Sequence, residues 1–407
     1  MRVAFVVQRY GPEVAGGAEA LCRRTAQALA DAGDDVHVYT TTARDYLTWA
    51  PHYDEGVTQD GAVTVHRHAV DPPDPHLAAD LARMLAVRPD QDIEARWARA
   101  QGPVTRGLLA DLQGAARRHE VVALWTYLYA TTQLAMPLVA DRAVLVPLAH
   151  DEPMLRFGIT RGVARLARGL AFLTPEEREL VDHVLGIGDR PHAIVGAGID
   201  PPPPGDPHRA RRLFGLPPRF ALYVGRVDGA KGVDALVRHH QAYRDARGRG
   251  DLGLVLAGRP AGDLRLPDWV IATGFVDEAA RADLYAAADV VVLPSPWESL
   301  SLVALEAWQA RRPTLAYARS DVLAGQTARS GGGLLYTGAD TYAEQLARLA
   351  ANPDLRGELG DAGHAYALRH TWPACVDRWH DLLDRVRRPL TAAAAPPPGG
   401  HGNASPA

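Results

Sequence analysis

A loop that follows an apolar run at residues 220–224 carries two cations, Arg226 and Lys231, among glycines. Lysine and arginine together number 44, and Lys231 is the only lysine. A composition that favours arginine this strongly indicates that the one lysine has a task arginine does not perform. Two cations beside the N–H groups of a helix N-terminus suit a diphosphate. The alternative is a surface loop that is basic by chance, and the placement of the single lysine favours the diphosphate site.

Two glutamates eight residues apart, Glu298 and Glu306, form a second pattern, the first in a loop and the second in the helix expected after it. Carboxylates accept hydrogen bonds, so such a pair suits the hydroxyls of a sugar or a ribose. The alternative is a solvated helix face, which is common for glutamates at this spacing. Apolar neighbours of Glu306 argue against that alternative: Leu302, Val303, Leu305 and Ala307.

His150 ends an apolar run at residues 144–149 and is followed by Asp151 and Glu152. A histidine after an apolar strand is often a structural residue whose hydrogen bonds are satisfied. The carboxyl ends of parallel strands face the ligand cleft of an open α/β sheet, which favours a role in the site instead. We expect Asp151 to orient the imidazole ring.

The elements that position these residues alternate between short apolar strands and helices, which predicts an α/β fold with parallel, doubly wound sheets. Helices are expected at residues 18–32, 93–118, 175–185 and 372–388. Strands are expected in the first half at 3–7, 36–41, 63–66, 121–125, 144–149, 170–173 and 193–195, and in the second half at 220–224, 252–257, 270–272, 290–293, 314–317 and 334–336.

Four consecutive prolines at 201–204 interrupt the alternation and predict a stiff linker. Two Rossmann-like domains would then face each other across a cleft that holds the ligand. The expected divisions are an acceptor-binding domain at 1–198, a proline-rich linker at 199–218, a nucleotide-sugar-binding domain at 219–371, a last helix at 372–388 that packs back on the first domain, and a disordered tail at 389–407.

These motifs resemble those of glycosyltransferase family 4, the retaining nucleotide-sugar-dependent enzymes of the GT-B fold. The matching features occur in family order and cover nearly the whole chain up to Arg388. They are the glycine pair Gly16-Gly17, the Arg226–Lys231 pair, the segment GFVDE at 274–278 and the two glutamates Glu298 and Glu306. The loop after Glu298 is less glycine-rich than in many relatives, so the resemblance does not define the donor-sugar pocket.

The resemblance implies a role for each matched residue. Arg226 and Lys231 would grip the donor diphosphate and act in catalysis with His150 and Glu298. Glu306 would bind the ribose, and the glycine pair would let the N-terminal loop approach the phosphate. The donor-binding set it implies is Gly16, Gly17, Arg226, Lys231, Phe275, Val276, Glu298, Ser299, Leu300, Ser301, Leu302 and Glu306.

The function expected from these features is a hexosyltransferase. It would move a sugar from a UDP- or GDP-sugar to a hydroxyl, with retention at the anomeric carbon. No cofactor and no metal are expected, since the two cations would stabilise the leaving diphosphate. The acceptor stays open among a polysaccharide or other glycan, a lipid-linked molecule and a secondary metabolite. The alternatives are a GT-B phosphorylase or epimerase, and a carbohydrate- or nucleotide-binding protein without transferase activity.

Composition excludes other classes. The net charge of -4 argues against a nucleic-acid partner. Two distant cysteines and the lack of a long apolar stretch favour the cytoplasm. Residues 154–173 hold four arginines and no acid, so a peripheral contact with the inner face of a membrane is open, with a solvated helix face the favoured interpretation. The Asp90-Gln91-Asp92 segment is expected to cap a helix rather than bind metal.

Overall fold

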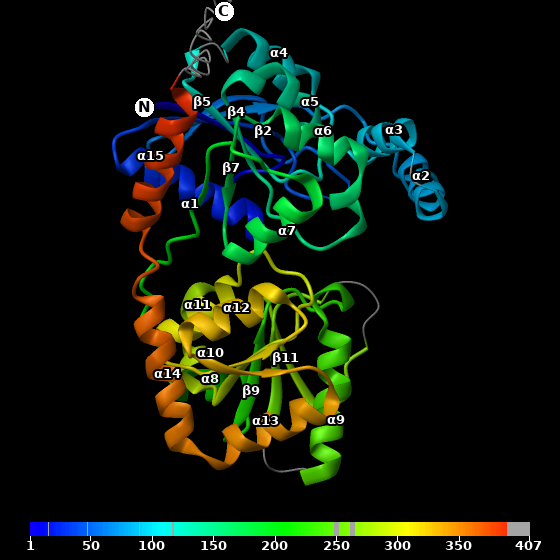
Figure 1. The fold of residues 1–407 in the computed structure, drawn as a ribbon. Coiled ribbons are helices and arrows are strands. Elements are labelled where there is room, and N and C mark those ends of the chain that lie inside the picture. The colour runs from blue at the N-terminus through cyan, green and yellow to red at the C-terminus, as the bar shows by residue number, and fades with distance from the viewer. Residues whose placement is uncertain are drawn as a thin grey trace, which may run out of the picture.

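The computed structural model describes residues 1–14, 16–46, 48–88, 90–115, 118–247, 252–260 and 265–388. Two lobes lie one above the other in Figure 1, and each has a central sheet with helices on both faces. The predicted α/β architecture of two doubly wound domains is confirmed. The tail at 389–407, expected to be disordered, lies outside the described residues.

The N-terminal sheet has eight strands in the order β3-β4-β2-β1-β5-β6-β7-β8, and all neighbours are parallel except β3 and β4. The central strands are continuous apolar runs because helices bury both faces of a parallel sheet. Its strands are β1 (Arg2–Val6), β2 (Asp35–Thr41), β3 (Gly56–Asp60), β4 (Val63–His68), β5 (Val121–Trp125), β6 (Ala143–Val146), β7 (Gly169–Phe172) and β8 (His192–Ile194).

The C-terminal sheet has six parallel strands in the order β11-β10-β9-β12-β13-β14. The strand order reverses beside β9, and the crevice at such a switch point is where ligands bind in open α/β sheets. Its strands are β9 (Phe220–Val224), β10 (Gly253–Ala257), β11 (Val270–Gly274), β12 (Val290–Leu293), β13 (Thr314–Tyr317) and β14 (Gly333–Tyr336).

Helices cover both faces of each sheet in Figure 1. In the N-terminal lobe they are α1 (Gly17–Asp31), α2 (Pro75–Val87), α3 (Gln91–Gln101), α4 (Arg106–Ala115), α5 (Ala130–Val139), α6 (Gly158–Leu166) and α7 (Pro175–Leu185). The others are α8 (Pro207–Phe214), α9 (Val233–Arg247), α10 (Glu278–Ala287), α11 (Leu302–Gln309), α12 (Asp321–Ser330), α13 (Ala339–Ala351), α14 (Pro353–Ala367) and α15 (Trp372–Arg387).

The single helix predicted at 93–118 is wrong, because the structure has two helices there, α3 and α4. Gly102 ends α3 with a φ of 76°, and Pro103 follows it, so the chain cannot continue as a helix. At the start of α3 the Asp90 side chain accepts hydrogen bonds from the N–H groups of Asp92 and Ile93. Asp90 is therefore a helix cap, as predicted.

The segment at 199–218 that was predicted as a linker contains a helix. Prolines 201–204 lie in no helix or strand, but α8 begins soon after them and packs against α10. Arg209 on α8 pairs with Asp283 on α10. The Asp283 carboxylate also accepts a hydrogen bond from the backbone N–H of Asp206. The helix therefore packs as part of the C-terminal lobe.

The last helix, α15, returns to the N-terminal lobe and packs against α1 and β8 (Figure 1, red). Its Trp379 is buried against Phe5 and Trp125 of the central strands. Between the lobes the chain therefore crosses twice, at 199–206 and at 368–371. Among the described residues, no helix is long and apolar enough to cross a membrane.

Candidate active site

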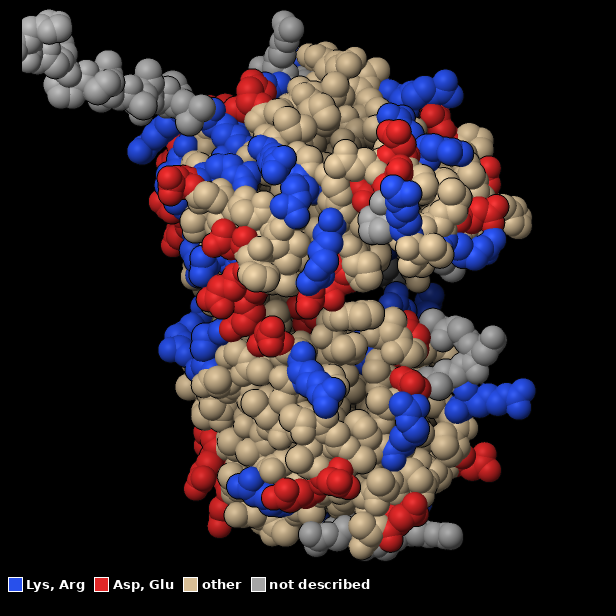
Figure 2. Space-filling model, turned by 45° about the vertical axis from the view of Figure 1, so that its right-hand side comes forward, with Lys and Arg blue, Asp and Glu red and all other residues tan. Residues whose placement is uncertain are grey.

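A cavity of about 400 Å³ lies between the two lobes and is lined by residues that follow the carboxyl ends of strands in both sheets. The groove between the lobes is visible in Figure 2. From the N-terminal lobe come Gln8, Arg9, Gly16, Gly17, Glu19, Tyr46, Thr126, Tyr127, Tyr129, His150 and Glu152, and from the C-terminal lobe Arg226, Lys231, Glu298, Ser299, Leu300 and Leu302.

The only lysine of the chain is bonded to the first glutamate of the pair. Lys231 Nζ donates to Glu298 Oε1 at 2.9 Å, with about a third of the lysine side chain exposed to the cavity. The loop after β9 is fixed beside the loop after β12 by Gly232, whose φ is 74°. A Cβ at that position would lie 2.5 Å from the carbonyl oxygen of Pro294. Glycine is therefore required for this close approach.

Arg226 lies on the same loop and pairs with Asp228, while its Nη1 reaches the Tyr46 hydroxyl of the opposite lobe at 3.4 Å. The Asp228 carboxylate also accepts from the Lys231 N–H at 2.9 Å, so it holds the loop that carries both cations. The two predicted cations therefore line one cavity, each beside a carboxylate that a bound anion would displace or share.

His150 lines the same cavity near Glu298 and Lys231. Burial lowers the pKa of the imidazole, and the carboxylates of Glu152 and Glu298 partly oppose that shift. The expectation that Asp151 orients the ring is wrong, because the Asp151 carboxylate turns to solvent and pairs with Arg156 at 2.6 Å. Consecutive residues in a loop point in different directions, and Glu152, not Asp151, lines this cavity together with His150.

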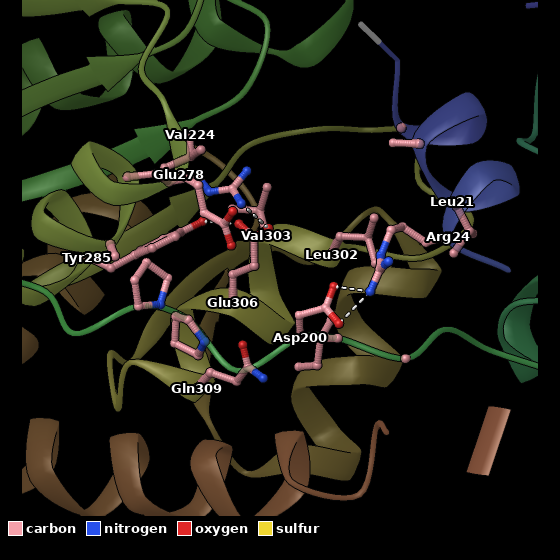
Figure 3. Close-up of a pocket in the computed structure, with 18 of the residues that line it drawn as sticks. Leu21, Arg24, Asp200, Val224, Glu278, Tyr285, Leu302, Val303, Glu306 and Gln309 are labelled. Atoms are coloured by element: carbon pink, nitrogen blue, oxygen red, sulfur yellow. Dashed lines mark hydrogen bonds and ion pairs between the residues drawn. The ribbon is translucent and has the colours of Figure 1, made fainter. Parts of the chain in front are cut away.

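A second cavity, of about 540 Å³, adjoins the first and shares Gly17, Leu21 and Leu302 with it. Glu306 projects into it from α11 (Figure 3). The carboxylate accepts from the Tyr285 hydroxyl at 2.8 Å and pairs with Arg281 at 3.4 Å. Burial raises the pKa of Glu306, and these two partners oppose the rise.

The glycine pair lies at the start of α1, where both cavities meet. A Cβ on Gly16 would lie 2.1 Å from Glu19 Oε2, whereas a Cβ on Gly17 would meet no atom within 4 Å. Gly17 is therefore not needed for packing within the protein. It leaves open space beside the free N–H groups of the helix start, as a phosphate requires.

The predicted loop after Glu298 is divided in its role. Ser299, Leu300 and Leu302 line the first cavity. Ser301 is buried instead, since its Oγ caps α11 by accepting from the Ala304 N–H and its own N–H donates to Gln326. Its side chain positions the helix that carries Glu306.

Like Ser301, the predicted residues Phe275 and Val276 line neither cavity. Phe275 is 67% exposed with Arg259 over its ring, and Val276 packs against the core of the lobe. Both lie on the loop after β11, next to Glu278, which does line the second cavity. The structure therefore places the segment near the site but not those two side chains in its wall.

Several lining residues were not predicted from the sequence. The Glu19 carboxylate accepts from Gln8 and from the Nε of Arg9, and Arg9 Nη1 donates to the carbonyl of Arg44. On the floor of the second cavity Arg24 pairs with both carboxylate oxygens of Asp200 at 2.6 Å (Figure 3). The Arg24–Asp200 pair joins residues far apart in sequence, so no spacing reveals it.

Backbone strain marks the same wall. Thr126 and Leu148, which follow β5 and β6, have φ values of 62° and 52° and both line the first cavity. A β-branched residue in the left-handed region is an outlier, and such outliers cluster at functional sites. A residue-type pattern carries no signal for this.

Comparison with known proteins finds similarity to glycosyltransferases. Residues 218–352 match the family model described as Glycosyl transferases group 1. A curated D-inositol 3-phosphate glycosyltransferase 2 from Catenulispora acidiphila is 33% identical over 59% of this chain and 61% of that protein. The first curated relatives are matched over only 49% to 62% of their own length.

Solved structures match over the whole chain. A sucrose-phosphate synthase from Thermosynechococcus elongatus has a TM-score of 0.70 at 19% identity, with 95% of this chain and 98% of that chain covered. HepE from Anabaena in complex with UDP has a TM-score of 0.68 at 15% identity, with 94% and 100% covered. At these identities the likeness establishes the fold, and it is the GT-B fold.

Proposed function

Because the chain is of the family-4 glycosyltransferase type in sequence and has the GT-B fold, we propose that it transfers a sugar from a nucleotide-diphosphate sugar to an acceptor hydroxyl. The observation that carries the proposal is the convergence of Lys231, Arg226 and Glu298 on one cavity with Glu306 in the adjoining one. A diphosphate needs cations, whereas the hydroxyls of a sugar and of a ribose need carboxylates that accept their hydrogen bonds. The structure of HepE is a complex with UDP, which favours a UDP-sugar as the donor of this chain.

The donor would lie across both cavities. Glu306 would accept hydrogen bonds from the ribose hydroxyls, and the α1 N-terminus with Arg226 and Lys231 would hold the diphosphate. Glu298 and the backbone of the following loop would hold the transferred sugar, below His150. Phe275 and Val276, which the resemblance places in the donor-binding set, would contact the donor only through their backbone.

The proposed chemistry rests on charge. As the bond between the anomeric carbon and the phosphate oxygen breaks, negative charge grows on the diphosphate, and Lys231 and Arg226 stabilise it. The acceptor hydroxyl attacks the same face and gives its proton to the departing phosphate oxygen, which retains the anomeric configuration. His150, kept neutral by burial, holds a hydroxyl of the sugar. No metal is needed in this scheme, since the two cations supply the positive charge.

A contact between residues 154–173 and a membrane is not part of this proposal. Arg156 pairs with Asp151, and Arg168 donates to the carbonyl of Val386 at 2.5 Å, so these two cations are engaged by the protein itself. We therefore favour a solvated surface over a membrane contact for residues 154–173. Sedimentation with anionic vesicles tests this, and the protein should stay in the supernatant.

The transferase proposal is tested by incubating the protein with UDP-glucose, UDP-galactose and GDP-mannose. The release of the nucleoside diphosphate, UDP or GDP, is measured. Slow release without acceptor and faster release with an acceptor is the expected result. Proton NMR of the product should show the anomeric configuration of the donor. If the donor stays intact in every incubation and no nucleotide binds, the result would favour a protein without transferase activity.

A further inference from the structure

The acceptor side of the first cavity has an unusual charge balance. Its N-terminal wall is lined by one cation, Arg9, and by two carboxylates, Glu19 and Glu152. The undescribed residues adjacent in sequence to this wall, Ala15 and Leu47, carry no charge. The wall is therefore negative by one charge before any ligand enters.

Arg9 is not available to an incoming anion. Its side chain is 6% exposed, and it donates from Nε to Glu19 at 3.0 Å and from Nη1 to the Arg44 carbonyl at 2.9 Å. The Tyr46 ring lies 5.2 Å from the guanidinium carbon and covers one face of it. A phosphate would have to break this buried pair and leave Glu19 without its partner, which is costly.

Glu152 is the group that a ligand meets instead. It lines the cavity beside His150, and the Tyr127 hydroxyl donates to its Oε1. A carboxylate with free lone pairs accepts hydrogen bonds from hydroxyls and repels a phosphate. The exposed part of the Tyr46 ring supplies an apolar face in the same cavity.

The cavity on the far side of His150 does not change this balance. It encloses about 310 Å³ and shares His150 and Glu298 with the first cavity. Arg319 is the only lysine or arginine among its lining residues. Figure 2 shows acidic side chains gathered along part of the groove between the lobes. The carboxyl groups that line this cavity are Asp151, Glu176, Glu177, Glu298 and Asp321.

On the premise of the transferase function above, we propose that the acceptor is an uncharged polyhydroxyl compound, a sugar or a cyclitol, and that Glu152 makes the wall reject a phosphorylated one. On the same premise Lys231 and Arg226 do not serve an acceptor phosphate, since the donor diphosphate would occupy both of them. In this respect the chain differs from the curated relatives, whose name specifies D-inositol 3-phosphate.

The test uses matched pairs that differ only by a phosphate: myo-inositol with D-inositol 3-phosphate, and glucose with glucose 6-phosphate. Release of diphosphate is followed with the nucleotide sugar that stabilises the protein most. We expect a neutral member to accelerate release and its phosphorylated partner to be at least about tenfold less effective, the size of discrimination that like charges impose. Glu152→Gln should bring the release rates with the neutral and the phosphorylated acceptor closer together. Glu179→Gln, on an exposed part of α7, should leave the ratio of these two rates unchanged.

A phosphorylated member that works as well as its neutral partner, or better, overturns the proposal. So does a panel in which no neutral member accelerates release, because the named class is then wrong. A ratio that Glu152→Gln leaves untouched removes Glu152 from the account. Stabilisation by UDP, GDP and ADP is measured alongside, and absence of stabilisation of the wild-type protein by all three would instead refute the transferase function.

Discussion

Lys231 Nζ and Glu298 Oε1 lie 2.9 Å apart, and they join the loop after β9 to the loop after β12. Without a donor the lysine charge is neutralised by the glutamate. A bound diphosphate would share the lysine, and the glutamate would turn part of its hydrogen-bonding capacity to the sugar. On the proposed function, the pair would therefore link recognition of the phosphate to recognition of the transferred sugar.

Glu298→Gln should separate these two tasks. The amide keeps the shape but removes the competing charge, so affinity for free UDP should stay the same or rise. Release of UDP from the sugar donor should fall by about 10²-fold, as for loss of one preorganised polar group at a reacting centre. Calorimetric titration with UDP and the coupled release assay measure the two quantities.

The control for this experiment is Glu344→Gln, an exposed carboxylate on α13 far along the chain from the site. It should change neither quantity. Parallel loss of UDP affinity and of turnover in Glu298→Gln would show that Glu298 binds the nucleotide rather than the sugar.

Glu306 predicts a pH dependence of nucleotide binding. Its pKa is raised by burial, and the Tyr285 hydroxyl opposes this rise by donating to the ionised form. Protonation removes an acceptor for the ribose, so UDP affinity should fall as the pH is lowered towards that pKa. In Tyr285→Phe the fall should begin at a higher pH, because the ionised form has lost its hydrogen bond.

The comparison variant is Glu306→Gln, which has no carboxyl group to titrate. Its affinity should be weaker by about tenfold, close to one charged hydrogen bond, and its pH profile should lack the contribution of residue 306. Calorimetric titration with UDP in steps of about one pH unit, from about pH 5 to about pH 8, gives the profiles. Identical profiles for the wild type and Glu306→Gln would remove the carboxylate from the ribose site.

Chelation separates charge from metal in the mechanism. If Lys231 and Arg226 supply the positive charge at the diphosphate, EDTA should leave the rate of UDP release unchanged. Loss of activity in EDTA that Mg²⁺ or Mn²⁺ restores would contradict the metal-independent scheme. Lys231→Ala, tested without EDTA and with added Mg²⁺, shows whether a metal replaces the lost charge.

An imidazole cluster on the N-terminal sheet predicts acid sensitivity of the fold. Burial lowers the pKa of His119 to about 3, and it also lowers the pKa values of His37 and His66. Because the unfolded chain binds these protons more readily, their contribution to stability is complete above the unfolded pKa of about 6.5 and is lost as pH falls below it. The melting temperature should drop between pH 7.5 and pH 5, an interval of about two decades around that value.

His119→Asn should reduce this drop, since it removes the most shifted of these groups. The matched control is His208→Asn on α8, where the side chain is exposed and the drop should stay as in the wild type. An equal drop in both variants would place the acid sensitivity elsewhere.

The fold was largely predictable because its strands are buried on both faces. Continuous apolar runs such as 290–293 and 314–317 coincide with β12 and β13. The edge strand β3 was missed, since its sequence GVTQD is polar and mostly exposed. The error at 93–118 came from reading helical periodicity across Gly102 and Pro103, where local backbone chemistry stops the helix.

The candidate site was predictable where composition or spacing singled out residues. Lys231 stood out as the only lysine, and Glu298 and Glu306 by their spacing and apolar neighbours. The Arg9–Glu19 pair was not predictable because it depends on the path of the loop between β1 and α1. The contact of Glu152 with Tyr127 was not predictable because it depends on how the loops after β5 and β6 meet. The error on Asp151 shows that adjacency in sequence does not give the direction of a side chain.

The central claim is that this cavity binds a nucleotide diphosphate through Lys231. The most direct test is the thermal shift with UDP, GDP, ADP and their sugars for the wild type, Lys231→Ala and the exposed control Arg238→Ala. A ligand that binds the native state raises its stability by mass action. We predict that one diphosphate stabilises the wild type and Arg238→Ala but not Lys231→Ala, whose own stability is within about 1 kcal/mol of the wild type. Absence of a shift with every diphosphate, or an equal shift in Lys231→Ala, would contradict the account.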